Sequence, residues 1–215
     1  LAGKRLFNST VGAATTLLLL FSTLYLFYTF RLLLEIPTLL FTSMTIMIFY
    51  MVFEEKKFHL LPLLGLAGAA GLISKYLFIS VLAPLALIAL VFYFKEVKEK
   101  IVSIIISVVI ALLVFSPLFL LGLRETGSPL GLITVYLTPY VNLPADYYFT
   151  ILPHVFSNMF FVILLFIGIA LGAIKRDKKI IALTAIFFIG LIVMTVAQGY
   201  KEDRYILHLQ PVGAL

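Results

Sequence analysis

The chain has 215 residues, of which 63% are hydrophobic and 12% are charged. Its mean hydropathy is +1.17. Soluble globular proteins carry about 25% charged residues, so the composition excludes an ordinary soluble domain and indicates an integral membrane protein. The chain has no cysteine, which excludes a disulfide framework and a thiolate metal site. Its net charge of +6 does not call for a nucleic acid partner, because membrane topology accounts for the basic residues.

Apolar runs bounded by charges and prolines predict membrane-spanning helices. A helix needs about 20 residues to cross about 30 Å of hydrocarbon, and the runs lack the alternation of a membrane barrel. We expect an all-α, polytopic transmembrane bundle with about seven full spans plus the start of an eighth. The expected spans are 9–30, 36–53, 58–74, 76–94, 101–123, 154–174 and 180–198, with the eighth beginning near Tyr205. Residues 1–215 are expected to form a single transmembrane domain, as an internal fragment of a longer protein.

Lys75 decides the topology. Residues 58–94 form either one long buried run or two short spans that turn at "ISKY". With a turn there, eleven of the sixteen Lys and Arg residues fall on one face, which the positive-inside rule assigns to the cytoplasm. The eleven are Lys4, Arg5, Lys56, Lys57, Lys95, Lys98, Lys100, Lys175, Arg176, Lys178 and Lys179. Their clusters are expected to be solvated loops.

Residues 124–153 are expected to form one long external loop. Long loops in compact proteins are usually functional or disordered, and this loop is too rich in Leu, Ile, Tyr and Pro for disorder. Its central sequence, "LGLITVYLTPYV", is compatible with an amphipathic helix in the membrane interface, with tyrosines at the depth of the lipid headgroups.

Unusual charges gather on the predicted external face. Arg31 and Glu35 are four residues apart near the outer end of the first span, so they share a helix face, and Pro37 starts the return helix. The pair is either a surface anchor that reaches water or part of a site. Lys75 follows a Gly/Ala-rich helix. It is either a lysine at an ordinary turn or part of a substrate site, because ionisable residues in membrane segments are costly.

The segment "YKEDRYILHLQP", residues 200–211, places charges beside the last apolar run. Arg204 and Tyr205 offer a planar fork and a hydroxyl to a phosphate at the membrane surface. An ordinary loop with an interfacial tyrosine remains the alternative. The three histidines form no spaced metal motif, although His154 or His208 with an external carboxylate could hold a divalent ion. The metal ligands therefore stay unknown.

Four features occur in a fixed order: "R-x-x-x-E-x-P", "GLISKY" after a Gly-rich helix, the long external loop, and "KEDRYILHLQP". In this order they resemble membrane glycosyltransferases of the GT-C fold. The resemblance is strongest to protein O-mannosyltransferases and lipid A aminoarabinose transferases that use polyprenyl-phosphate sugars, in their archaeal or bacterial branch. It covers nearly the whole chain, and the order and spacing of the motifs carry it.

The resemblance implies roles for particular residues. The main catalytic acid of this family lies in the first external loop, which is expected upstream of Leu1. Glu35 occupies the second acidic position and acts as an accessory acid. Lys75 matches a lysine that ends a Gly-rich helix, and Arg204 and Tyr205 match a motif near the lipid phosphate, although His208 and Gln210 interrupt that motif. Arg31, Lys75, Lys201 and Arg204 then stabilise the departing phosphate.

The implied reaction moves a sugar from a polyprenyl-phosphate donor to a protein, lipid or glycan acceptor, with inversion, at the outer face of a prokaryotic plasma membrane. A divalent metal ion is a candidate cofactor, and no nucleic acid is involved. Two other functions are compatible with the residues. A multi-span transporter also places charges among its helices, but the chain shows no internal repeat. A non-catalytic subunit that binds a lipid-linked sugar is the other.

Overall fold

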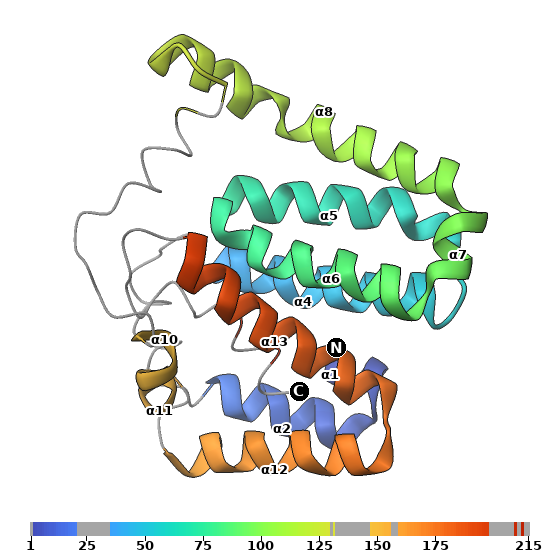
Figure 1. Cartoon of the computed structure of the whole chain (residues 1–215), viewed down its shortest axis with the longest axis vertical. Helices are drawn as coiled ribbons and strands as arrows, with labels where there is room; N and C mark the ends of the chain where they lie inside the picture. Colours follow the sequence, from blue (N-terminus) through green and yellow to red (C-terminus); the bar gives the residue numbers. More distant parts are fainter. Residues whose placement is uncertain are drawn as a thin grey trace.

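The computed structural model describes residues 2–20, 35–129, 131, 147–155, 159–197, 209 and 212. Within these residues the chain forms helices and no strand (Figure 1). The α-helices are α1 (Ala2–Leu6), α2 (Ser9–Leu20), α4 (Glu35–Phe53), α5 (Leu61–Ser74), α6 (Ile79–Phe92), α7 (Phe94–Glu99), α8 (Ile101–Thr126), α10 (Tyr147–Thr150), α11 (Leu152–Val155), α12 (Met159–Lys175) and α13 (Lys178–Ala197). Two 3₁₀ turns, η1 (Phe58–Leu60) and η2 (Tyr76–Phe78), precede α5 and α6.

The prediction of an all-α chain is confirmed for the described residues, and their helices follow the predicted spans closely. Two of these helices are long and apolar enough to cross a membrane: α8, and α13 over Lys178–Thr195. Shorter apolar stretches in the same part of the chain are Ser9–Leu20, Pro37–Phe53, Phe58–Ser74, Tyr76–Phe92 and Val162–Lys175. The number of spans therefore stays a prediction.

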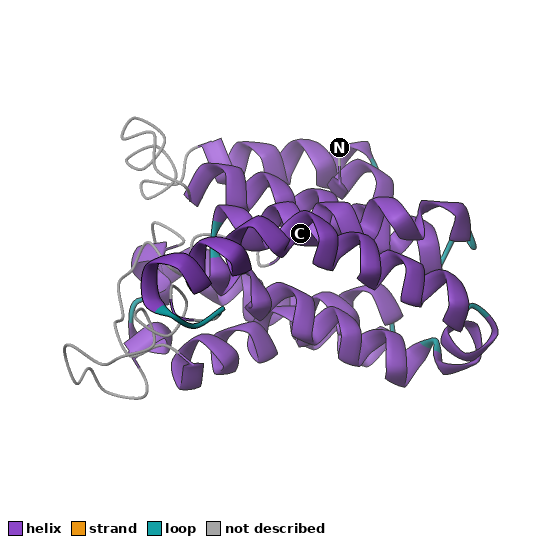
Figure 2. Cartoon of the chain, turned by 90° about the horizontal axis from the view of Figure 1, so that it is seen from above, coloured by secondary structure: helices purple, strands orange, loops and turns teal. Residues whose placement is uncertain are grey.

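The long helices run back and forth, roughly parallel to one another (Figures 1 and 2). Helix α5 packs against both α4 and α8, and α6 packs against α13. Fully buried apolar side chains fill the space between these helices, among them Val52, Phe78 and Leu191. Burying such side chains supplies about 1.5–3 kcal/mol each relative to water. Within a bilayer, close packing between helices takes over that role.

Glycines on α5 explain how closely its neighbours approach. A Cβ atom at Gly65 would lie 2.2 Å from the carbonyl oxygen of Ser107 on α8. A Cβ at Gly68 would lie 3.2 Å from Leu82 on α6, and one at Gly71 would lie 2.4 Å from the ring of Phe78. The three glycines, three residues apart, therefore each admit a different neighbour. The Gly-rich sequence of α5 sets its packing, as small residues do at helix contacts in membranes.

The predicted basic loops gather at one end of the bundle. Helix α1, the loop 54–57, the segment 93–100 and the α12–α13 turn lie together there (Figure 1). We call this the basic end. The Nε and Nη2 atoms of Arg5 donate to the Glu55 carboxylate at 2.7 and 2.5 Å. Lys56 pairs with Glu96 on α7.

Two further contacts join segments at the basic end. The ammonium of Lys179 on α13 donates to the carbonyl oxygen of Leu6 at 2.7 Å. The hydroxyl of Tyr93 donates to Glu54. The prediction that these charges share one face agrees with these contacts.

Replacing Arg5 by Gln should raise the pKa of Glu55. Hydrogen bonds from Arg5, and then from Lys57, lower that pKa from its ordinary 4.5 to about 2. A carboxyl with a lowered pKa in the folded state stabilises the fold above its ordinary pKa, and this contribution is lost as the pH falls from 4.5 through about 2. Carboxyl NMR titration of the wild type and of Arg5→Gln measures the shift. A smaller rise in the Lys57→Gln control is expected, and an unchanged pKa in Arg5→Gln would contradict the assignment.

Candidate active site at the Lys75 end

The turn at Lys75 lies at the end of the bundle opposite the basic end. Helix α5 starts beside the basic end and its 14 residues cover about 21 Å, so Lys75 lies one helix length away. Its backbone is extended, with φ −162° and ψ 123°. The Lys75 N–H donates to the Gly71 carbonyl and its own carbonyl accepts from Phe78, both at 2.9 Å. The predicted turn between two short helices is therefore present, and we call this end of the bundle the Lys75 end.

Packing of Phe78 against Gly71 explains why the chain turns at this position. The Phe78 ring is fully buried and occupies the space where a side chain at Gly71 would lie. This contact folds η2 back onto the end of α5. In the sequence "GLISKYLF", Lys75 is therefore partly exposed, while Leu77 and Phe78, which follow it, are buried.

Glu35 is the first residue of α4, whose last residue lies at the basic end. The first turn of α4 therefore lies at the opposite end of the bundle, the Lys75 end. The sequence predicted that Pro37 starts this helix. The helix starts two residues earlier, because a proline in the first turn removes no intrahelical hydrogen bond. Arg31 lies outside the described residues, so its shared face with Glu35 stays a prediction. Further along α4, Thr38 and Thr42 are fully buried, and the Thr42 hydroxyl donates to the Thr38 carbonyl at 2.9 Å.

The last turn of α8 also reaches the Lys75 end (Figure 1). Gly127, in the left-handed conformation with φ 72°, ends this helix as glycine commonly does. Arg124 lies 3.7 Å from Glu125, and both side chains are exposed. The predicted external loop 124–153 therefore begins with helical residues and ends in α10 and α11. Its centre, with the predicted interfacial helix, lies outside the described residues.

Leu209 places part of the C-terminal segment beside α6. A Cβ atom built on Gly190 of α13 would lie 3.0 Å from Leu209 and 2.8 Å from the carbonyl oxygen of Ser80. Ser80 is in the first turn of α6, five residues after Lys75. Leu209 is itself fully buried. The chain thus passes close to the Lys75 end four residues after Tyr205.

The structure leaves the rest of the predicted site open. Lys201, Arg204 and Tyr205 lie outside the described residues, as do His208 and the carboxylates of Asp146, Glu202 and Asp203. The backbone of His154 is in α11, but its side chain is not described. Among the described residues no three His, Asp or Glu side chains form a group that could hold a metal ion. The ligands of a metal stay unknown.

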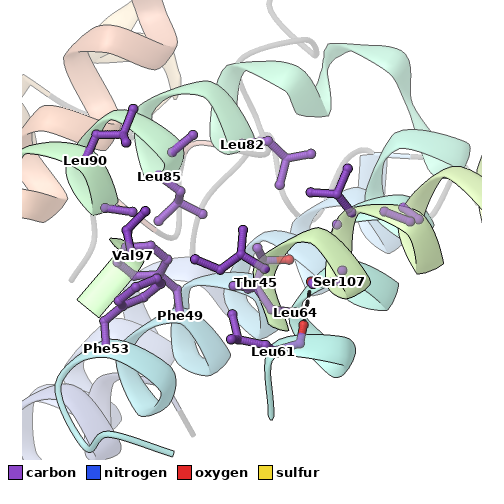
Figure 3. A pocket seen from close by; sticks show the side chains of 18 of the residues that line it. Thr45, Phe49, Phe53, Leu61, Leu64, Leu82, Leu85, Leu90, Val97 and Ser107 are labelled. Carbon is purple, nitrogen blue, oxygen red and sulfur yellow. Dashed lines mark hydrogen bonds between the residues drawn. The ribbon is translucent and has the colours of Figure 1, made fainter. Parts of the chain in front are cut away.

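Sequence reasoning missed an apolar cavity of about 470 Å³ between α4, α5, α6 and α8 (Figure 3). Its lining includes Gly65 and Ala86, and the excess of small residues on α5 and α6 was the signal that could have revealed it. Ser107 lines it too, but its hydroxyl donates to the Leu61 carbonyl at 2.6 Å. Thr45 also lines the cavity, and its buried hydroxyl has no hydrogen-bond partner among the described residues.

Replacing Thr45 by Val should stabilise the protein. A buried hydroxyl without a partner costs about 1–3 kcal/mol, and the substitution removes it at nearly constant volume. Thr42→Val is the matched control one turn earlier, because the Thr42 hydroxyl is bonded, so its removal should be neutral or destabilising. Reversible unfolding in detergent measures both free energies. Destabilisation by Thr45→Val would show that this hydroxyl has a partner in the membrane.

Comparison with protein families decides what the chain is related to. The family model of the dolichyl-phosphate-mannose-protein mannosyltransferases matches residues 1–121, which is more than half of the 215 residues. The chain belongs to this family. The match includes Arg31, Glu35 and Lys75, whereas Arg204 and Tyr205 lie beyond it. Comparisons with curated proteins and with solved structures gave no match.

Membership in this family agrees with the composition of the chain. The family consists of integral membrane proteins, and the apolar helices α8 and α13 are compatible with that setting. The predicted resemblance to a GT-C type mannosyltransferase is thereby confirmed at the level of the family. Family membership implies mannosyltransferase activity in general terms.

Proposed function

We propose that the complete protein is an inverting membrane glycosyltransferase that moves a sugar from a polyprenyl-phosphate donor to an acceptor at the external face. Family membership is the single observation that carries this proposal. The description of the family suggests mannose as the sugar and a protein hydroxyl as the acceptor. Glycolipid or glycan acceptors are the alternatives that an acceptor screen would reveal.

The geometry supports the Lys75 end as the place of transfer. Lys75 and the first residue of α4 share this end of the bundle, one helix length from the clustered lysines and arginines. The positive-inside rule assigns the basic end to the cytoplasm of a prokaryotic plasma membrane. A multi-pass arrangement then puts Lys75 and Glu35 at the outer surface, where the phosphosugar of a membrane-anchored donor is exposed.

The reaction needs two kinds of group at this depth. As the acceptor oxygen bonds to the anomeric carbon, the bond from that carbon to the phosphate oxygen breaks, and its electron pair leaves with the polyprenyl phosphate. Cations stabilise this charge, and Arg31, Lys75, Lys201 and Arg204, with the hydroxyl of Tyr205, are the proposed donors. A carboxylate takes the proton of the acceptor. Glu35 is the accessory acid that orients the acceptor or an arginine.

A reconstituted transfer assay tests the proposal. The complete gene product in liposomes receives a short-chain dolichyl-phosphate-mannose and a Ser/Thr-rich acceptor peptide, and mass spectrometry and NMR identify the product. We expect a glycosylated peptide with inverted anomeric configuration. Movement of labelled sugar across the membrane without transfer would support a transporter. Donor binding without either would support a non-catalytic subunit.

Cysteine scanning should show Lys75 on the external side. The chain has no cysteine, so Lys75→Cys provides a single thiol without further engineering. We expect it to react with a membrane-impermeant maleimide added to intact cells, because the turn lies opposite the basic end. Lys98→Cys at the basic end is the control and should react only after permeabilisation. The reverse pattern would overturn the proposed orientation.

A further inference from the structure

The apolar cavity runs along α5 from Leu61, beside the basic end, to Leu72, which is three residues before Lys75. Residues of α4, α5, α6 and α8 line it. Its volume of about 470 Å³ is within the range of about 300–1,000 Å³ that ligand pockets occupy. Protein interiors rarely leave voids much larger than a water molecule. We therefore expect another molecule to fill a space of this size.

The cavity opens sideways between α6 and α8. Leu90 on α6 and Val108 on α8 line it, yet they are 52% and 51% exposed. Nearly all of the lining is hydrocarbon, and the Ser107 hydroxyl is already bonded within the protein. Water needs several polar partners at a buried site, which this lining does not offer. In a bilayer, the chain of a lipid fits such an opening.

The cavity also borders positive charge. Val97 at the end of α7 and Ile101 at the start of α8 line it, and Lys98 and Lys100 lie between them in the chain. Neither lysine forms an ion pair with a described carboxylate, whereas Lys56 at the same end pairs with Glu96. The ammonium of Lys100 lies 5.3 Å from the centre of the Phe58 ring. Both lysines, with Glu99 between them, therefore adjoin in the chain two residues that line the basic end of the cavity.

We propose that the cavity holds one acyl chain of an anionic phospholipid whose phosphate lies between Lys98 and Lys100. The acyl chain replaces contacts that the empty space lacks, and the lysines attract the headgroup, as basic residues near a membrane surface do. The inference rests on the membrane placement in the proposed function but not on its chemistry. The proposed phosphate position is at the basic end, and the acyl chain extends from there along α5 toward Leu72.

Substitution of Thr45 tests whether the bound lipid carries a polar group inside the cavity. The Thr45 hydroxyl lies in the middle of α4 and has no partner in the part of the chain that the structure describes, and a hydrocarbon chain offers it no acceptor. Thr45→Val should therefore leave phospholipid binding unchanged. A lipid with a polar group along its chain or on an apolar ring would bond to Thr45, so a loss of binding in Thr45→Val would overturn the acyl-chain assignment.

Native mass spectrometry of the complete protein, with added 1-palmitoyl-2-oleoyl phosphatidylglycerol or phosphatidylcholine, tests the proposal. Phosphatidylglycerol should bind about 25-fold more tightly, because each of the two cations contributes about 1 kcal/mol, or about fivefold. Lys98→Gln combined with Lys100→Gln should remove most of this preference. Lys175→Gln, an exposed basic residue on α12, is the control and should retain it. Equal affinity for the two lipids in the wild type would overturn the headgroup assignment.

Variants that fill the cavity test where the acyl chain lies. Ala86→Trp on α6 should abolish stable phosphatidylglycerol binding, and Ala111→Phe on α8 should do the same from the other side, so misfolding of one variant leaves the test intact. Leu87→Trp is the matched control, because Leu87 is exposed and does not line the cavity. Retained binding in a folded cavity-filling variant would overturn the proposal. Failure of the transfer assay with lipid binding intact would count against the proposed function alone.

Discussion

Replacing Glu35 by Gln is expected to lower sugar transfer by about 10²–10³-fold, which is the usual effect of losing one positioned electrostatic group. The amide keeps the shape of the side chain and removes its charge. Glu35 begins α4, and the dipole of a helix favours a carboxylate at this position. Its backbone therefore has a place in α4 whatever Arg31 does.

The measurement for Glu35 is turnover of a polyprenyl-phosphate sugar by the complete protein at matched expression. Glu125→Gln is the matched control, since Glu125 also lies at the Lys75 end but is exposed beside Arg124. We expect this control to retain activity within about threefold, as an exposed pair contributes little. If chemistry is rate-limiting and Glu35→Gln behaves like the control, Glu35 is a surface residue and not part of the site.

The sequence was sufficient to predict the long helices of the described residues and the turn at Lys75, but not the short helices α1, α7, α10 and α11. Both depend on local signals, namely apolar runs that end at charges, and the lysine after a Gly-rich stretch. The predicted span 36–53 and the observed α4, Glu35–Phe53, differ by one residue. The difference lies at the proline, where a helix can begin before Pro37 at no cost in hydrogen bonds.

The sequence could not predict contacts that depend on how the helices assemble. Arg5 and Glu55 are fifty residues apart and form a bidentate ion pair, yet either residue alone resembles a solvated loop charge. The cavity is a second example. It depends on the spacing that Gly65 and Ser107 set between α5 and α8, and no single segment encodes that spacing. The lone hydroxyl of Thr45 becomes informative only once its surroundings are known.

The candidate site was predictable only in part, for a related reason. Lys75 lies at the end of α5 and Glu35 at the start of α4, and the directions of these helices follow from the alternation of spans, so their common end could be deduced. Arg204 and Tyr205 lie more than a hundred residues further along the chain and outside the described residues, so their predicted approach to Lys75 stays a prediction. Leu209 beside Ser80 and Gly190 is the described contact that brings the C-terminal segment near this end.

If Lys75 and Arg204 hold the same phosphate, their substitutions should not act independently. Lys75→Gln and Arg204→Gln are each expected to lower kcat/KM for the polyprenyl-phosphate sugar by about 10²-fold, because each removes one cation from the developing charge of the leaving group. Groups that share a partner couple, so the double variant should lose clearly less than the product of about 10⁴-fold. Binding of free polyprenyl phosphate should weaken in parallel, because the product carries the same charge.

Two comparisons complete the double-mutant cycle that consists of Lys75→Gln, Arg204→Gln and their combination. Arg124→Gln is the control cation, since it lies in the last turn of α8 at the Lys75 end but is 83% exposed beside Glu125. Its combination with Lys75→Gln should be additive, as for sites without a shared partner. Additivity between Lys75→Gln and Arg204→Gln as well would mean that the two residues act on separate groups. The proposed phosphate site would then lose Arg204, and the C-terminal segment would be left with the packing role that Leu209 already has.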